Sequence, residues 1–99
     1  MRFWTYILRC ADGSYYVGHT DDLEGRIARH ADGTFGGYTA NRRPVTLAFA
    51  EVSDSRDEAF RRERQIKGWS RAKKEALIEG NWERLQQLAR TAHPSTGSG

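Results

Sequence analysis

The chain has 99 residues, of which 37% are hydrophobic and 29% charged, and its formal net charge at pH 7 is +3. This length favours a single domain with one small core, and the composition is typical of a soluble globular protein. No apolar run reaches the roughly 20 residues of a membrane-spanning helix, and we expect no secretory signal. The lone Cys10, in a strand-like run, cannot form an internal disulfide and is expected to be buried, and this cysteine usage favours a cytoplasmic protein. We expect no membrane contact.

Two strands joined by a tight turn are predicted at the start of the chain. Residues 3–10 are rich in aromatic and β-branched side chains, and "ADGS" carries an Asp-Gly turn signal. The stretch "SYYVGHT", residues 14–20, is typical of the returning strand. Gly18 breaks its pattern of side chains, and we expect this glycine to mark the end of the strand.

Helices and a third strand follow the predicted hairpin. A helix capped by Thr20 or Asp21 is expected to run to about Ala31, followed by a loop over residues 34–44. The remaining elements are a strand over residues 44–52, helices over residues 56–68, 70–79 and 82–90, and a disordered tail over residues 92–99. The order β-β-α-β-α-α-α predicts one α+β domain over residues 1–91, with helices packed on the sheet.

Polar side chains border the apolar face of the first predicted helix. Leu23, Ile27 and Ala31 are expected on its inner face, with Arg26 and His30 beside them. A snorkelling arginine and a half-exposed histidine would explain this pattern without any function. A functional site between this helix and the sheet would explain both residues together.

A carboxylate interrupts the apolar stripe of the second long helix. The apolar positions of that stripe are Ala59, Phe60 and Ile66, and Glu63 lies among them. A carboxylate there is costly unless it is paired or bound to a cation. Two interpretations of Glu63 stay open. It forms a buried ion pair with an arginine, or it is a metal-binding or acid–base carboxylate. Tyr6 and Tyr16 can share one face of the hairpin, as core or as site residues. Together with Arg26 and His30, these groups suit attack on a phosphodiester.

The quoted stretches resemble a known family. "TYILRCADGSYYVGHTDDLEGRIARH" is similar to the first half of a GIY-YIG nuclease domain, and "EAFRRERQIKGWSRAKKEALI" to the second half of its small stand-alone members. The two tyrosine motifs fall on "WTY", which lacks the usual Gly-Ile, and on "YVG". The resemblance implies a three-stranded antiparallel sheet flanked by helices. It also implies a metal-dependent endonuclease that hydrolyses DNA in repair or processing.

Site residues follow from the same resemblance. The implied catalytic residues are Tyr6, Tyr16, Arg26, His30 and Glu63. Glu63 would bind Mg²⁺ or Mn²⁺, with water and phosphate oxygens completing the coordination. Arg26 would bind the scissile phosphate, one tyrosine would help to activate water, and His30 would relay or orient a proton. Gly18 would leave space beside the metal, and His19 is not included in the set.

Basic side chains cluster in residues 56–74 and again in the loop before the third strand, which indicates either a nucleic-acid surface or a solvated helix face. The expected DNA contacts are Tyr38, Thr39, Arg42, Arg43, Lys67, Arg71, Lys73 and Lys74. Branched, nicked and single-stranded DNA are candidate substrates, and a targeting protein is a candidate partner. Two other function classes stay open, namely a nucleic-acid-binding module with little catalysis and an interaction subunit of a repair complex.

Overall fold

The structure is a computed structural model that describes residues 2–92. It confirms the α+β class and the predicted order β-β-α-β-α-α-α. The chain divides into two compact units, Met1–Lys67 and Gly68–Gly99. The predicted tail lies outside the described residues, apart from Ala92, and the boundaries of a single domain over residues 1–91 stay a prediction.

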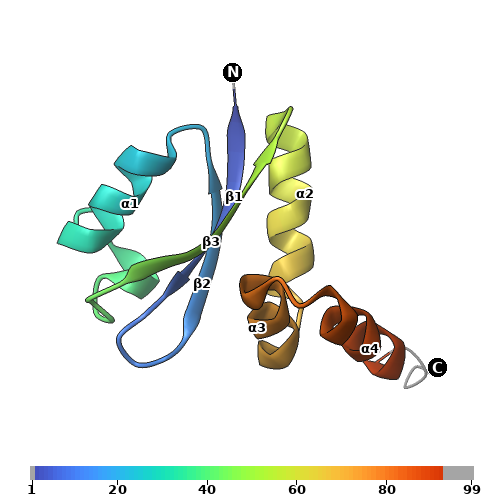
Figure 1. The fold of residues 1–99 in the computed structure, drawn as a ribbon. Coiled ribbons are helices and arrows are strands. Elements are labelled where there is room, and N and C mark those ends of the chain that lie inside the picture. Colours follow the sequence, from blue (N-terminus) through green and yellow to red (C-terminus); the bar gives the residue numbers. More distant parts are fainter. Residues whose placement is uncertain (1, 93–99) are drawn as a thin grey trace. The chain divides into compact units, whose positions relative to one another are not determined.

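The first unit is built on a three-stranded antiparallel sheet with the strand order β2-β1-β3 (Figure 1). Its strands are β1 (Phe3–Arg9), β2 (Tyr15–Thr20) and β3 (Thr46–Ser53). The central strand β1 is buried on both faces, and Cys10 just after it is buried as predicted. β3 begins two residues later than expected, after Pro44.

Helices cover the two faces of this sheet (Figure 1). α1 (Leu23–Asp32) lies on one face and α2 (Arg56–Lys67) on the other. Because side chains alternate along a strand, Thr5 faces α2, where its Oγ1 donates a hydrogen bond to the carbonyl of Ala59 at 3.0 Å. The next residue, Tyr6, faces α1. The two layers therefore receive different residues of the same central strand.

α1 differs from the sequence-based expectation at its cap and at Ala31. Asp22, rather than Thr20 or Asp21, caps the helix by accepting a hydrogen bond from the Gly25 N–H at 3.2 Å. Ala31 is exposed instead of lying on the inner face. The helix ends at Gly33 with a φ of 82°, a left-handed conformation that a glycine adopts without strain.

The segment between α1 and β3 is more ordered than the predicted loop. It contains a short 3-10 helix, η1 (Gly37–Thr39), preceded by Gly36 with a φ of 78°. Gly37 also has a positive φ of 68°. These two glycines permit the sharp change of direction that turns Thr39 inward, where its side chain is buried.

The second unit contains α3 (Arg71–Glu79) and α4 (Trp82–Ala92), which pack against each other. Ser70 caps α3 by accepting a hydrogen bond from the Lys73 N–H at 3.2 Å, and Gly80 ends it with a φ of 70°. Within residues 2–92 no helix has the length and apolar character needed to cross a membrane.

Candidate active site

Predicted site residues of the first unit meet at the outer edge of β2, around Gly18 and His19. Tyr6 is opposite Gly18 in the β1–β2 register, and a Cβ added to Gly18 would lie 2.6 Å from Tyr6 Oη. The absent side chain therefore lets the Tyr6 ring cross the β2 backbone. The prediction that Gly18 ends the strand is wrong, because β2 continues to Thr20. The space beside Gly18 is filled by Tyr6, and a metal near this glycine stays a prediction.

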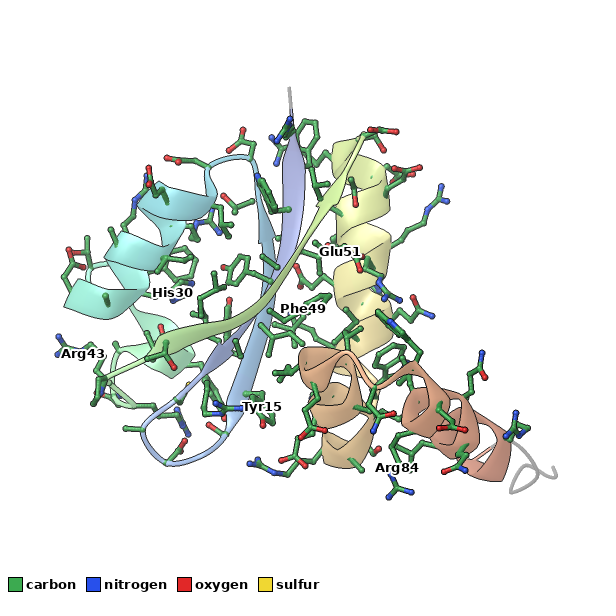
Figure 2. The ribbon with its side chains drawn as sticks, viewed as in Figure 1. Tyr15, His30, Arg43, Phe49, Glu51 and Arg84 are labelled. Carbon is green, nitrogen blue, oxygen red and sulfur yellow. The ribbon has the colours of Figure 1, made fainter. Side chains whose placement is uncertain are left out.

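Tyr6 is joined to His30 of α1 by a buried hydrogen bond. Tyr6 Oη and His30 Nε2 are 3.0 Å apart, and His30 Nδ1 lies 2.7 Å from Thr39 Oγ1. All three side chains are at most 1% exposed. Figure 2 shows the His30 side chain between α1 and the sheet. The expectation that Thr39 contacts a phosphate is wrong, because its hydroxyl is enclosed against the imidazole.

Tyr16 lies on the same face as Tyr6, as predicted. Its ring centroid is 6.4 Å from that of Tyr6 and 5.1 Å from that of His30. On its outer side it stacks on Tyr38 at 6.0 Å, and Tyr38 is 41% exposed. The aromatic group thus runs from the buried Tyr6–His30 pair to the surface.

Burial holds the Tyr6–His30 pair in its neutral form. Burial raises the pKa of Tyr6 to about 12, although the Arg26 guanidinium acts in the opposite direction. Burial and the positive charge of Arg26 both lower the pKa of His30. Near neutral pH the pair is therefore a phenol beside an uncharged imidazole, with one proton on the ring.

Arg26 is placed at the edge of β2, next to the buried pair. Its Nη1 donates to the His19 carbonyl at 3.4 Å, and its guanidinium carbon lies 4.9 Å from the centre of the Phe35 ring. A guanidinium has five N–H donors. Arg26 can therefore keep the contact with His19 and still present donors to an anion at this edge.

Glu63 reaches the same edge from α2 through His19. His19 Nδ1 donates to Glu63 Oε1 at 2.5 Å, and Lys67 Nζ lies 2.7 Å from Oε2. Burial would raise the pKa of Glu63, but the hydrogen bonds from Lys67 and His19 hold it below its ordinary value. The carboxylate is therefore ionised, and its partners are a lysine and a histidine instead of the arginine that the sequence suggested.

His19 belongs to this site, although the set of residues predicted from the sequence did not include it. It follows Gly18 directly, and alternation along β2 turns it away from the face of Tyr16 and toward α2. That placement links Glu63 on one face of the sheet to the β2 backbone, whose His19 carbonyl accepts from Arg26. The alternation of side chains along β2 predicts the face on which His19 lies, but only the position of α2 shows that Glu63 lies on that face.

Glu63 is the residue that can hold a divalent cation. Residues 2–92 contain no cluster of three or more His, Cys, Asp or Glu side chains suited to a metal. Mg²⁺ commonly binds through one or two carboxylates, with water and substrate phosphates as its other ligands, so one ionised carboxylate fits it. The Lys67 ammonium, paired with the same carboxylate, competes with such a cation.

Two hollows share Phe60 as a lining residue, and Glu63 lines one of them. One has a volume of about 490 Å³ and is lined by His19, Arg56, Asp57 and Phe60. The other has a volume of about 270 Å³ and is lined by Phe60, Glu63, Arg64 and Lys67. Phe60 is 42% exposed, so its expected place in the apolar stripe is wrong. Instead its ring packs against His19 at 5.5 Å.

The expected DNA contacts of the loop have partners within the first unit. Arg42 donates to Asp12 at 3.1 Å and lies 3.8 Å from the centre of the Tyr38 ring. Arg43, at the outer surface beyond η1 (Figure 2), donates to the Ala40 carbonyl at 3.1 Å. The binding of both arginines to DNA stays a prediction.

The remaining expected contacts belong to the second unit. Arg71 pairs with Glu75 at 3.1 Å along α3, and Lys73 Nζ lies 4.5 Å from the centre of the Trp69 ring. Lys74 is half-buried on the same helix. Their role in DNA binding also stays a prediction.

Comparisons with known proteins show which family the chain resembles. Residues 2–76 match the family model described as the GIY-YIG catalytic domain. A UPF0213 protein of Halobacterium salinarum is 51% identical over 73 residues, which cover 74% of this chain and 95% of that protein.

Two solution NMR structures are also similar to this chain. The UPF0213 protein BH0048 of Bacillus halodurans has 41% identity and a TM-score of 0.53, over 89% of this chain and 97% of that one. Protein EF2693 of E. faecalis has 36% identity and a TM-score of 0.57, over 81% and 85%. The fold therefore recurs in single small proteins of nearly the same extent.

Proposed function

Since the chain belongs to the GIY-YIG catalytic domain family, we propose that it is a metal-dependent endonuclease that hydrolyses phosphodiester bonds in DNA. The observation that supports this most is the meeting of Arg26, the Tyr6–His30 pair and Glu63 around two residues of β2. An anion-binding group, a proton-transfer pair and an ionised carboxylate are the parts that hydrolysis of a phosphodiester needs.

Arg26 is the proposed phosphate ligand. Its guanidinium matches two phosphate oxygens in a bidentate contact, and its bond to the His19 carbonyl fixes where the phosphate would lie. As charge grows on the phosphate oxygens during attack, a donor already held in place stabilises it without reorganising. Arg26 would therefore raise the turnover rate more than the affinity for DNA.

Proton removal is assigned to Tyr6 and His30. A phenol with a pKa of about 12 is a poor base as long as it keeps its proton. His30 Nε2, 3.0 Å from Tyr6 Oη, is placed to take that proton and leave a phenolate that can deprotonate water. Tyr6 is fully covered in the free protein, so this step needs the bound substrate to bring a water to Oη. The half-buried Tyr16 beside it is the alternative base.

Glu63 would hold Mg²⁺ or Mn²⁺ at this edge. A bound divalent cation supplies Lewis-acid stabilisation of the phosphate charge. The contribution of the chain is to keep the carboxylate ionised and oriented, which His19 does through its hydrogen bond to Oε1. His19 is therefore proposed as a residue that positions the metal ligand.

Cleavage of branched, nicked and single-stranded DNA with Mg²⁺ or Mn²⁺ tests the proposal. Nicking should require the metal and be lost in Glu63→Gln. Glu51→Gln is the matched control, because Glu51 is also an ion-paired glutamate of the first unit, bound to Arg62 at 2.8 Å. Salt-sensitive binding without cleavage would favour a nucleic-acid-binding module, and neither binding nor cleavage would favour an interaction subunit. A repair role and a targeting partner are part of the same proposal.

A further inference from the structure

A buried threonine hydroxyl faces the second nitrogen of His30. Thr39 is 1% exposed, and its Oγ1 lies 2.7 Å from His30 Nδ1. The short helix η1 and the two glycines around its start turn this side chain inward. The backbone fixes the position of Thr39, and its carbonyl also accepts a hydrogen bond from the Arg42 N–H at 3.1 Å. The contact is built by the fold and does not depend on a mobile surface side chain.

The polarity of this hydrogen-bonded row follows from the two hydroxyl groups on either side of the ring. A phenol, with an ordinary pKa near ~10, is a stronger hydrogen-bond donor and a weaker acceptor than the aliphatic hydroxyl of a threonine. The Tyr6 O–H is therefore directed to His30 Nε2, which lies 3.0 Å from Oη. A neutral imidazole that accepts at Nε2 carries its proton on Nδ1. Thr39 Oγ1 is the acceptor that faces this Nδ1–H.

We propose that Thr39 is a positioning residue that holds His30 in the tautomer able to accept the proton of Tyr6. In the transfer, the O–H bond of Tyr6 breaks and an N–H bond forms at His30 Nε2. The ring becomes an imidazolium that keeps its Nδ1–H bond to Thr39, and Tyr6 becomes a phenolate beside the Arg26 guanidinium. The hydroxyl thus satisfies Nδ1 before and after the step, which matters because a buried N–H without a partner is costly.

Removing the hydroxyl should reverse the tautomer. In Thr39→Val, a proton on Nδ1 would be buried without an acceptor. The ring would then carry its proton on Nε2 and donate it to Tyr6 Oη. A nitrogen that already holds a proton cannot accept another, so the pair would lose its proton acceptor. Thr39→Ser keeps a hydroxyl at the same place and should restore the original tautomer.

The experiment is long-range ¹H–¹⁵N NMR of the full chain labelled with ¹⁵N-histidine. His30→Asn identifies the His30 signals among those of the three histidines. We expect a proton on Nδ1 in the wild type and in Thr39→Ser, and on Nε2 in Thr39→Val. A wild-type ring protonated on Nε2, or a Thr39→Val ring still protonated on Nδ1, would overturn the proposal.

The catalytic consequence rests on the proposed function and is measured separately. The nicking rate should fall about tenfold or more in Thr39→Val, since a positioned proton acceptor contributes ~100-fold or more, and recover in Thr39→Ser. Thr5→Val is the matched control, because it removes another buried threonine hydrogen bond on the opposite face of the sheet. Equal losses in both valine variants would overturn the role of Thr39. Absence of cleavage by the wild type would overturn the nuclease, while the NMR result would still decide the tautomer.

Discussion

The Tyr6 ring fills the space that a side chain on Gly18 would need at the edge of the sheet. A Cβ on Gly18 would lie 2.6 Å from Tyr6 Oη and 2.7 Å from its ring carbon Cζ. Gly18→Ala should therefore push the Tyr6 ring away from its place. Forced overpacking costs about 1–3 kcal/mol, and displacement of Oη would also break the bond to His30. We expect a lower free energy of unfolding, measured by urea denaturation, and loss of nicking.

A double-mutant cycle separates this clash from a general effect on β2. In a Tyr6→Leu background the shorter side chain no longer reaches Gly18, so adding Gly18→Ala should cost almost nothing further. Equal costs of Gly18→Ala in the wild type and in Tyr6→Leu would contradict the assignment of the space to Tyr6.

The sequence predicted those features that depend on neighbouring residues. The Asp-Gly turn and the apolar runs beside it indicate the hairpin, and the period of the later segments indicates the helices. The shared face of Tyr6 and Tyr16 follows from alternation within two paired strands. Such patterns are local, so they can be interpreted without the packing of the chain.

Other features depend on contacts between distant residues. Gly18 is small because of Tyr6, which is known only once the strand register is known. His19 joins the site because α2 brings Glu63, which is 44 residues away, to that face of β2. Thr39 stands in a Gly-rich stretch typical of a surface loop, and only the turn at η1 buries it. No local pattern carries these pairings.

Removing Lys67 should strengthen metal binding. Its ammonium pairs with Glu63 Oε2 at 2.7 Å, and the lysine side chain is 51% exposed. Because exposed ion pairs contribute ~0.2–1 kcal/mol, Lys67→Met should tighten Mn²⁺ binding by a few fold in calorimetry without DNA. Arg61→Met is the control, since it removes the same charge from another i,i+4 pair of α2, with Asp57. An equal gain in both variants would mean that net charge alone acts.

His30 should make the fold sensitive to mild acid. Burial and Arg26 lower its pKa in the folded protein, whereas in the unfolded chain it has its ordinary value near ~6.5. As the pH falls from that value toward the lower folded pKa, the unfolded state binds the proton first, so stability is lost. The loss is at most ~1.4 kcal/mol per pH unit for one proton.

Urea denaturation between pH 8 and pH 5 measures this effect. His30→Asn has no imidazole at this position, so its unfolding free energy should fall less steeply than that of the wild type over the same range. The difference between the two proteins cancels the other titrating groups. Parallel curves would contradict a lowered pKa of His30.

Arg26 should matter more for turnover than for affinity. In the proposed function Arg26, which is held by its bond to the His19 carbonyl, would contact one phosphate only, whereas affinity for DNA is a sum over many phosphate contacts. Arg26→Ala should therefore lower the nicking rate by about 100-fold or more and weaken DNA binding by a few fold. Arg26→Lys should stay impaired, because an ammonium keeps the charge but not the bidentate fork. Arg29→Ala, an exposed arginine on the same helix, should keep its turnover; normal turnover in Arg26→Ala would remove this residue from the site.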